Sequence, residues 1–381
     1  MTPFSLEMPR AIHFGHGVLG KLPETVREIG ERVMILSGAG WLRGSPWDAA
    51  IEKGLEGCEI HRFFCPSSEP SVRSVAAAGA AAAAFRPEVL VAVGGGSVMD
   101  TTKALSALVR FPGSAERFLE GLPGAVPVPG PGLPWIAVPT TSGTGAEATK
   151  NAVITSETAG VKRSMRSRHL LAHAVLVDPE LTLSLPLGVT GTSGLDAFTQ
   201  LVEAYVSRSA TAPVRSLVEG AFPLMWDALD GLSRSPGDLG LREKASYGAL
   251  VSGVALANAG LGAAHGFAGA VGGMFNVPHG LACAVFLPHV LAANTDVILH
   301  DIGKLVGASH GAKAQQDPVA WLASEAERFL NEYGLPGDLR GFGIPREIVA
   351  ELAEKSAGSS MRGNPRELSM KERADILSRV V

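Results

Sequence analysis

Residues 89–100 read VLVAVGGGSVMD, and this stretch decides how the first half of the chain is interpreted. Val89–Val93 is a short, strongly apolar run, which predicts a buried strand. Gly94–Gly96 follows as a turn, and Ser97 with Asp100 three residues later has the pattern of a capping box at a helix start. Glycines let a ligand approach the backbone, and the first amides of a helix attract phosphate. The alternative is an ordinary tight turn, although three successive glycines are costly for that purpose alone.

The same order of strand, turn and helix recurs through the first half of the chain. Val33–Leu36 leads into a Ser/Gly/Ala turn at residues 37–40, Val75–Phe85 is an alanine-rich helical segment, and Trp135–Val138 is another apolar strand. This repetition predicts a parallel sheet with crossover helices. The spacing of the glycines differs from G-x-G-x-x-G, so the predicted domain is Rossmann-like rather than a standard dinucleotide fold. Residues 121–134, rich in glycine and proline, are expected to form an exposed loop.

The second half of the chain has a different pattern. From about Leu187 the apolar residues follow helical spacing, and helices are expected at residues 195–207, 214–229, 241–258, 279–291 and 318–333. A chain of 381 residues is too long for one ordinary core. We therefore expect an α/β dinucleotide-binding domain over residues 1–186 and an all-helical domain over residues 187–381, with the boundary near Pro186.

Composition and charge exclude several classes of protein. Apolar residues make up 46% and charged residues 18% of the chain, which is typical of a well-packed globular protein. The net charge of -4 argues against a nucleic-acid partner. Three scattered cysteines predict neither a disulfide framework nor a thiolate zinc site, and they fit a reducing cytoplasm. The N-terminus has no signal-peptide pattern, and we expect no membrane-spanning segment.

A second polar loop follows the strand at residues 135–138. Residues 139–147 read PTTSGTGAE, which supplies several hydroxyl groups, and Thr144 with Glu147 has a further capping-box pattern. A solvated Ser/Thr turn is the alternative interpretation. Two such loops at the ends of neighbouring strands favour one nucleotide that spans both, because ligands of open α/β sheets bind at those strand ends. Thr140, Thr141 and Thr144 are therefore candidate contacts to its ribose and nicotinamide side.

The helical half contains candidate metal ligands. Asp196 and Gln200 are four residues apart and share one face of a helix. His265 and His279 lie in apolar, glycine-flanked segments, and Asn276 and Pro278 suggest a helix start that aims His279 inward. A lone histidine is more often a satisfied core residue. Carboxylate and imidazole together, however, are ligands that first-row divalent metals accept.

These motifs together resemble the iron-containing (group III) alcohol dehydrogenase family over nearly the whole chain. The resemblance rests on the glycine–serine–aspartate loop at 94–100, the Pro-Thr-Thr-x-Gly-Thr-Gly run at 139–145, Asp178–Glu180, Gly194–Ala197 and the segment LACAVFLPH at 281–289. It implies a dehydroquinate synthase-like fold, with an α/β nucleotide-binding domain, a helical metal domain and an active site in the cleft between them. It also implies NAD or NADP, a single Fe²⁺ or Zn²⁺, and a homodimer or larger oligomer.

The predicted site follows from the motifs and the resemblance together. The predicted metal ligands are Asp196, Gln200, His265 and His279. Of these, Asp196, His265 and His279 are also the predicted catalytic residues. The predicted cofactor contacts are Gly38, Gly95, Gly96, Ser97, Asp100, Lys103, Thr140, Thr141 and Thr144. For Lys103, contact with a ribose and simple solvation are equally consistent with the sequence.

The chain departs from the family pattern at three places. Gln200 stands where the family has a ligand histidine, and a neutral amide oxygen is a poorer partner for Fe²⁺ or Zn²⁺. Gly269 stands where many members carry a histidine that helps with the proton. At Ser37–Gly38 no carboxylate grips a ribose 2′-hydroxyl, and Arg43 is close enough in sequence to attract a 2′-phosphate. We therefore expect NADP(H) to be accepted, with weakened metal binding.

The resulting functional hypothesis is metal-assisted hydride transfer between a nicotinamide and a small alcohol or its aldehyde or ketone. Three alternatives stay open at this point. A dehydroquinate synthase-like or a maleylacetate reductase-like enzyme would need a basic pocket, which the helical half does not display in its sequence. A catalytically weakened nucleotide-binding protein is suggested by Gln200 and Gly269.

Overall fold

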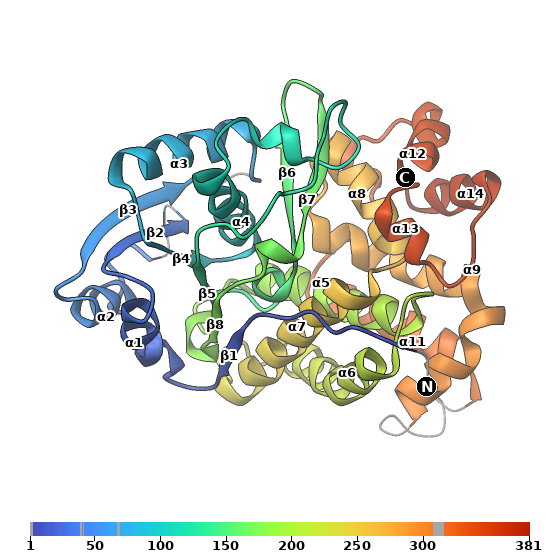
Figure 1. Ribbon diagram of the computed structural model, residues 1–381. Helices are drawn as coiled ribbons and strands as arrows, with labels where there is room; N and C mark the ends of the chain where they lie inside the picture. The colour runs from blue at the N-terminus through green and yellow to red at the C-terminus, as the bar shows by residue number, and fades with distance from the viewer. Residues whose placement is uncertain (1–2, 39, 41, 67–68, 308–315) are drawn as a thin grey trace. The chain divides into compact units, whose positions relative to one another are not determined.

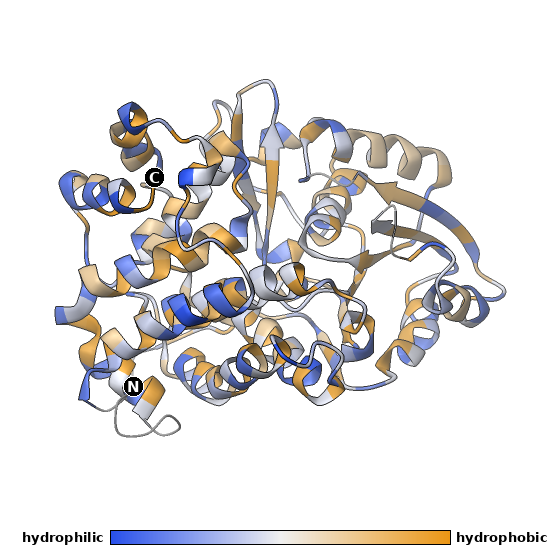
Figure 2. Ribbon diagram, turned by 180° about the vertical axis from the view of Figure 1, so that it is seen from behind, coloured by the Kyte–Doolittle hydropathy of each residue, from blue (hydrophilic) through white to orange (hydrophobic). Residues whose placement is uncertain are grey.

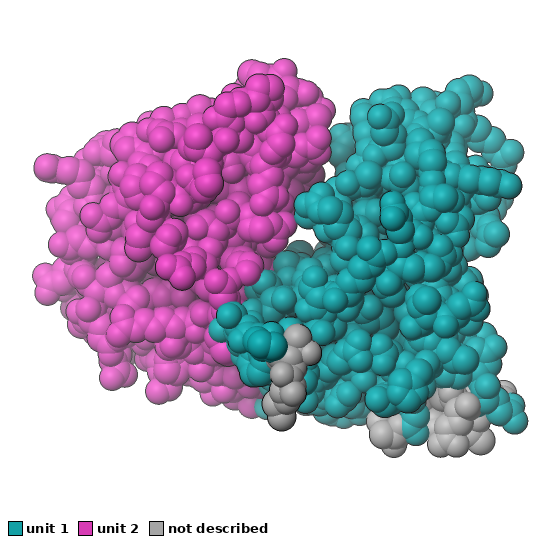
Figure 3. Space-filling view, turned by 45° about the vertical axis from the view of Figure 1, so that its right-hand side comes forward, with its two compact units in different colours: residues 1–6, 142–144, 183–381 teal, residues 7–141, 145–182 magenta. Residues whose placement is uncertain are grey.

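The computed structural model describes residues 3–38, 40, 42–66, 69–307 and 316–381. The chain separates into two compact units, coloured differently in Figure 3. We call the first, residues 7–141 and 145–182, the α/β unit. The second, which we call the helical unit, comprises the described residues within 1–6, 142–144 and 183–381. Ala39, in the turn expected after the strand at 33–36, lies outside the described residues.

The α/β unit is built around a parallel sheet. Its longer elements are β1 (Ala11–Phe14), α1 (Leu22–Arg27), β2 (Arg32–Gly38), α2 (Pro46–Gly54), β3 (Glu59–Cys65), α3 (Val72–Phe85), β4 (Val89–Gly94), α4 (Gly96–Arg110), β5 (Trp135–Pro139), β6 (Asn151–Ser156), β7 (Val161–Arg166) and β8 (Ala174–Val177). Short 3₁₀ turns lie at Val18–Lys21 (η1), Ala115–Phe118 (η2), Ala146–Ala148 (η3), Arg168–Leu170 (η4) and Pro179–Thr182 (η5). The strand order is β1-β8-β5-β4-β2-β3, and every neighbouring pair is parallel.

This strand order brings the predicted loops to one edge of the sheet. Gly94 at the end of β4 pairs with Pro139 at the end of β5, and the Thr140 N–H donates to the Gly94 carbonyl at 3.0 Å. On the other side, β4 pairs with β2, which ends at Gly38. The carboxyl ends of β2, β4 and β5 therefore lie side by side, and the loops after β4 and β5 meet there as the sequence predicted.

Both faces of the sheet are covered, which explains its apolar strands. Residues of β4 such as Val89 and Val91 share a core cluster with Leu22 and Val26 of α1 and with Ile51 of α2. On the other face α4 contacts β4 and β5, and α3 packs against α4. In Figures 1 and 2 the helices flank the sheet, and its strands are hydrophobic along most of their length. Strands buried on both faces read as continuous apolar runs, which is what β2, β4 and β5 show.

The helical unit encloses one large apolar core. Its main helices are α5 (Leu187–Val206), α6 (Ala212–Leu232), α7 (Leu239–Ala259), α8 (Ala263–Phe275), α9 (His279–Gly307), α11 (Pro318–Glu332), α12 (Val349–Lys355), α13 (Ser359–Gly363) and α14 (Met370–Val380), with 3₁₀ turns η6 (Arg340–Phe342) and η7 (Arg346–Ile348). The five helices expected from the sequence are confirmed as α5, α6, α7, α9 and α11. Helix α5 begins at Leu187, eight residues earlier than expected, and α9 continues through Pro288 to Gly307.

Helix α9 is long and apolar. By length and composition alone it could span a membrane, although no membrane-spanning segment was expected from the sequence. However, 67% of its most apolar window is buried inside the structure, and α5, α8 and α11 pack against it. Its hydrophobicity is therefore that of a core helix that is covered by neighbours.

A buried polar network joins α4 to the segment that leads into β6. The Lys103 ammonium, with a fully buried side chain, donates to Asp100 at 3.2 Å, to the Thr149 hydroxyl at 2.7 Å and to the Asn151 carbonyl at 2.8 Å. The interpretation of Lys103 as a solvated side chain is therefore wrong. The second Asp100 oxygen accepts the Val153 N–H at 2.9 Å. Every hydrogen of the ammonium group thus has a partner, as burial of a charge requires.

Glu147, in η3 beside this network, makes folding pH-dependent. Burial raises the pKa of its carboxyl group to about 7, from an ordinary value of 4.5. Between these two pH values the folded protein keeps a proton that the unfolded chain has lost, so the free energy of unfolding falls as pH rises through this window, by roughly 3 kcal/mol. Glu147→Gln should remove this fall, so the variant gains stability relative to wild type at pH 8 but not at pH 4.5. Urea unfolding across this range measures the effect, with exposed Glu56→Gln as the control; parallel curves for wild type and Glu147→Gln would contradict it.

Candidate functional site

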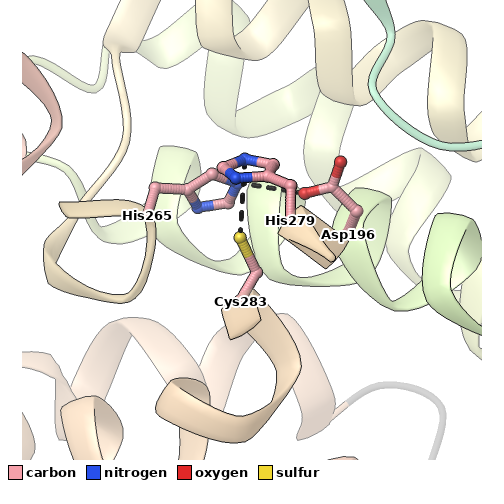
Figure 4. A group of neighbouring side chains, drawn as sticks. All are labelled: Asp196, His265, His279 and Cys283. Carbon is pink, nitrogen blue, oxygen red and sulfur yellow. Dashed lines mark hydrogen bonds and ion pairs between the residues drawn. The ribbon is translucent and has the colours of Figure 1, made fainter. Parts of the chain in front are cut away.

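Four side chains of types that can ligate a metal converge inside the helical unit. Asp196 comes from α5, His265 from the first turn of α8, and His279 and Cys283 from the start of α9. One ligand atom of each lies within 4.8 Å of the corresponding atoms of the other three. Figure 4 shows the four side chains pointing toward one another. The structure therefore brings together the three residues Asp196, His265 and His279, and adds a thiol that the sequence analysis left out.

The contacts inside this cluster are close, and three of its four side chains are buried, while His279 is half-buried. His265 Nε2 lies 3.2 Å from Asp196 Oδ1, and Cys283 Sγ lies 3.7 Å from His279 Nε2. The two imidazole rings meet edge to face, with centroids 5.5 Å apart. Asp196 and His265 are 2% and 6% exposed, and Cys283 is fully buried.

Glu203 of α5 fixes His265 in place. Its carboxylate accepts a hydrogen bond from His265 Nδ1 at 2.7 Å, which leaves Nε2 facing Asp196. The same carboxylate accepts the backbone N–H groups of Gly262 at 3.0 Å and Ala264 at 2.7 Å, with a longer contact from the His265 N–H at 3.4 Å. It therefore caps the N-terminus of α8 and also orients its first-turn imidazole. A carboxylate behind a ligating histidine is a common way to fix the tautomer and ring of a metal ligand.

Two glycines permit the close approach of the helices that carry the cluster. A Cβ at Gly280 would lie 2.1 Å from the Thr192 carbonyl oxygen and 3.1 Å from Asp196 Cβ, so only glycine lets the start of α9 meet α5 there. A Cβ at Gly262 would lie 2.7 Å from Glu203 Oε1. Without side chains at these two positions, Asp196, Glu203 and His279 can occupy one small volume.

Gln200, the predicted second ligand, is buried next to the cluster but is engaged elsewhere. Its Oε1 lies 2.9 Å from the Ser252 hydroxyl of α7, and its side chain also hydrogen-bonds Asp196, which helps to lower the pKa of that carboxyl group. Its amide oxygen thus points to α7, and its amide nitrogen is the group that can donate to the Asp196 carboxylate. In this arrangement Gln200 orients Asp196.

Charge is concentrated in this buried site. Burial by itself would raise the pKa of Asp196, but hydrogen bonding from His265 and the charge of His279 hold that pKa below its ordinary value. Burial would lower the pKa of His265, yet its hydrogen bonds with Asp196, Cys283 and Glu203 raise that pKa well above the ordinary value. Burial also raises the pKa of the Cys283 thiol to about 12. The site therefore stabilises positive charge between two buried carboxylates.

This donor set fits a divalent cation. Carboxylate, two imidazoles and a thiol are groups that Zn²⁺ and Fe²⁺ accept as ligands, and the negative surroundings favour a cation. The carboxylate behind His265 supplies the outer support that such ligands usually have.

Most of the predicted nucleotide contacts lie in the α/β unit, at or next to the carboxyl edge of its sheet. Gly95 and Gly96 lie at the start of α4, and an added Cβ at Gly95 would meet Thr141 at 3.2 Å. The predicted capping box is wrong, because Gly95 is the N-cap of α4 and no side chain caps it. Asp100 instead bonds Lys103 and the Val153 N–H. The first amides of α4 are therefore not capped by a side chain, which suits an anion.

The loop after β5 differs from its prediction in the same way. Turn η3 begins after Gly145, which has a left-handed conformation and no side-chain cap, so the proposed Thr144–Glu147 capping box is wrong. Thr140 is buried, and Thr141 is half-buried and lies beside Gly95. Residues 142–144, in contrast, belong to the helical unit. There, Ser142 Oγ lies 2.9 Å from Ser246 Oγ.

Comparison with known proteins identifies the family. The model of the iron-containing alcohol dehydrogenase family matches residues 9–179, and the model of its C-terminal domain matches residues 190–381. The chain belongs to the iron-containing alcohol dehydrogenase family.

Individual members of this family are similar over most of their length. The chain is 31% identical to long-chain-alcohol dehydrogenase 1 of Geobacillus thermodenitrificans, over 93% of this chain and 90% of that protein. It is 34% identical to lactaldehyde reductase of Escherichia coli over 76% of each chain. A crystal structure of a 1,3-propanediol oxidoreductase superposes with a TM-score of 0.91 over the full length of both chains, at 26% identity. The fold expected from the sequence is thus confirmed, and so is the enzyme class.

Two residues of this alcohol dehydrogenase site were not predicted from its sequence. Cys283 follows His279 by four residues, so helical spacing alone puts both on one face of α9. Glu203 follows Asp196 by seven residues and Gln200 by three on the same face of α5, but its partners on α8 are about 60 residues away in the chain. Spacing gave a signal for Cys283, whereas only the structure shows the role of Glu203.

Glu203→Gln tests the orientation of His265. The neutral amide keeps the shape of the side chain but replaces the carboxylate that binds Nδ1 and caps α8. Cation affinity should fall roughly 10–100-fold, and the metal-free protein should lose about 1–3 kcal/mol of unfolding free energy. Competition with a chromophoric chelator and urea unfolding measure the two effects. Exposed Glu354→Gln, on α12, is a control that should change neither, and unchanged affinity in Glu203→Gln would contradict the role.

Proposed function

We propose that this chain catalyses NAD(P)-dependent interconversion of a small alcohol and its aldehyde or ketone. The convergence of Asp196, His265 and His279 in one cluster, where Asp196 and His265 are buried and His279 is half-buried, carries the proposal. Family membership gives the reaction class. The relatives reported above are named as enzymes that act on alcohols or aldehydes. The three side chains are the residues that hold the cation in this proposal.

The chain prepares this site for a cation and a substrate oxygen. A bound divalent cation supplies Lewis acidity toward that oxygen. Glu203 holds the His265 ring with Nε2 toward Asp196, and Gln200 holds the Asp196 carboxylate. Preset donors avoid the cost of reorganising ligands when the cation binds. Gly269, one turn after His265, is exposed and offers no titratable side chain for the proton.

We infer that the nicotinamide cofactor, which would supply the hydride chemistry when bound, is held at the carboxyl edge of the sheet. Gly95, Gly96 and Ser97 would receive its pyrophosphate, since the α4 N-terminus has no side-chain cap. Thr140, Thr141 and Thr144 would contact its ribose and nicotinamide side. The ribose contact predicted for Lys103 stays a prediction, and the hydrogen bonds of Lys103 and Asp100 favour a positioning role for both.

The alternatives have weaker support. A maleylacetate reductase-like or dehydroquinate synthase-like enzyme is not favoured by the relatives, which are alcohol and aldehyde oxidoreductases by name. A nucleotide-binding protein without turnover would not need a preset donor cluster. A homodimer or larger oligomer and a cytoplasmic location stay predictions, and the free state of Cys58, Cys65 and Cys283 agrees with a reducing compartment.

The reaction is tested directly with purified protein. Metal-stripped enzyme is reloaded with Zn²⁺ or Fe²⁺ and mixed with NADPH or NADH and a panel of small aldehydes, and nicotinamide absorbance is followed. Turnover should require the cation and should fall at least 100-fold in Asp196→Asn, because the amide removes the anionic donor. Asp227→Asn, which removes a surface partner of Lys244, is the control. Bound nucleotide with no turnover under any condition would favour the nucleotide-binding alternative.

Cofactor preference is tested at the end of β2. Gly38 has open space at its Cβ position, and exposed Arg43 lies with its guanidinium 5.7 Å above the Phe64 ring at the end of β3. We expect NADP(H) to be accepted there. Gly38→Asp should lower the ratio of kcat/KM for NADPH to that for NADH about tenfold or more, since a carboxylate repels a 2′-phosphate. Gly20→Asp adds the same charge at an exposed glycine on η1 as a control. A large NADH preference in wild type, with NADPH constants unchanged in Gly38→Asp, would refute the expectation.

A further inference from the structure

The donor cluster contains one member with no assigned role, the thiol of Cys283. We propose that the Cys283 thiolate, and not Gln200, is the fourth protein ligand of the cation, which makes this a zinc-type site. The inference rests on the proposed function, because it concerns the same cation. It follows from where the oxygen of Gln200 and the sulfur of Cys283 lie.

Gln200 has a single atom that can coordinate a cation, its amide oxygen, and in the structure that oxygen lies toward Ser252 of α7. Its Oε1 accepts from the Ser252 hydroxyl at 2.9 Å, and its amide side bonds Asp196. Rotating the amide by half a turn would place Oε1 against the Asp196 carboxylate, where two oxygens repel each other. Gln200 is 2% exposed, so water offers no replacement partner.

Cys283, in contrast, presents its sulfur to the cluster. It lies one helical turn after His279 on α9, and its Sγ is 3.7 Å from His279 Nε2. Figure 4 shows the sulfur directed at the two imidazoles. The contact of Gly280 with Thr192 and Asp196 sets the position of the start of α9. The same packing therefore positions both His279 and the Cys283 thiol. Cys58 and Cys65 belong to the α/β unit and are not part of the cluster.

A thiolate ligand is also compatible with the charge of the site. Asp196 and Cys283 as anionic ligands balance a divalent cation, and the further negative charge, on Glu203, is stabilised by the backbone N–H groups of Gly262 and Ala264 at the start of α8. The thiol loses its proton to solvent as the sulfur–metal bond forms. One thiolate with imidazole and carboxylate ligands suits Zn²⁺ better than a hard cation such as Mg²⁺ or Mn²⁺.

Cobalt substitution tests the ligand set without reference to activity. Metal-stripped protein is titrated with Co²⁺, and near-ultraviolet absorption is recorded for the thiolate-to-cobalt charge-transfer band. Wild type should show the band at one cobalt per chain, and Gln200→Ala should keep it. Cys283→Ser should lose the band and bind Co²⁺ at least tenfold more weakly. Cys58→Ser and Cys65→Ser are the matched thiol controls and should behave as wild type.

A second measurement keeps the inference independent of how well the variants fold. X-ray absorption on zinc-loaded wild type should show one sulfur neighbour at about 2.3 Å. Full cation occupancy with no sulfur neighbour, or a cobalt band that survives in Cys283→Ser, would overturn the ligand assignment and leave the proposed function intact. Wild-type protein that turns over aldehydes without binding any cation would overturn both the ligand assignment and the metal part of that function.

Discussion

The buried carboxylate of Glu203 is the contact on which the site depends. It joins α5 to the N-terminus of α8 and to the Nδ1 atom of His265. A buried carboxylate is costly unless its oxygens are hydrogen-bonded, and here backbone N–H groups and the positive end of a helix provide the compensation. The same bonds set the distance between the helices that carry Asp196 and His265. Removing the compensation would therefore disturb fold and chemistry together.

The α/β unit makes its ligand edge from backbone rather than from charged side chains. Parallel pairing of β4 with β5 and with β2 aligns the ends of three strands. The glycine loop after β4 and the threonine loop after β5 therefore meet as a direct result of strand pairing. The buried Lys103 network then fixes α4 against the segment that enters β6. An uncapped helix start at Gly95 completes a surface that suits an anionic ligand.

Much of the fold was predictable because local pattern and burial agree in its central elements. β2, β4 and β5 are continuous apolar runs, and α5, α6, α7, α9 and α11 have helical apolar spacing. The missed elements have weaker local signals: β3 is a half-exposed edge strand, and α8 contains four glycines, which lower helix propensity. Helix α8 forms because a residue about 60 positions earlier caps it, and such a partner is invisible to local pattern. The contact of Gln200 with Ser252 was not predicted for the same reason. Neither predicted capping box forms, because Asp100 bonds Lys103 and Val153 and because glycines, Gly95 and Gly145, are the N-cap residues.

The central claim is that side chains from α5, α8 and α9 gather around one cation. The most direct measurement is a crystal structure of the zinc-loaded protein with anomalous data on both sides of the zinc absorption edge. The account predicts a single anomalous peak within about 2.0–2.3 Å of Asp196, His265, His279 and Cys283. A peak at another position, or those four side chains separated around an ordered solvent site, would contradict it.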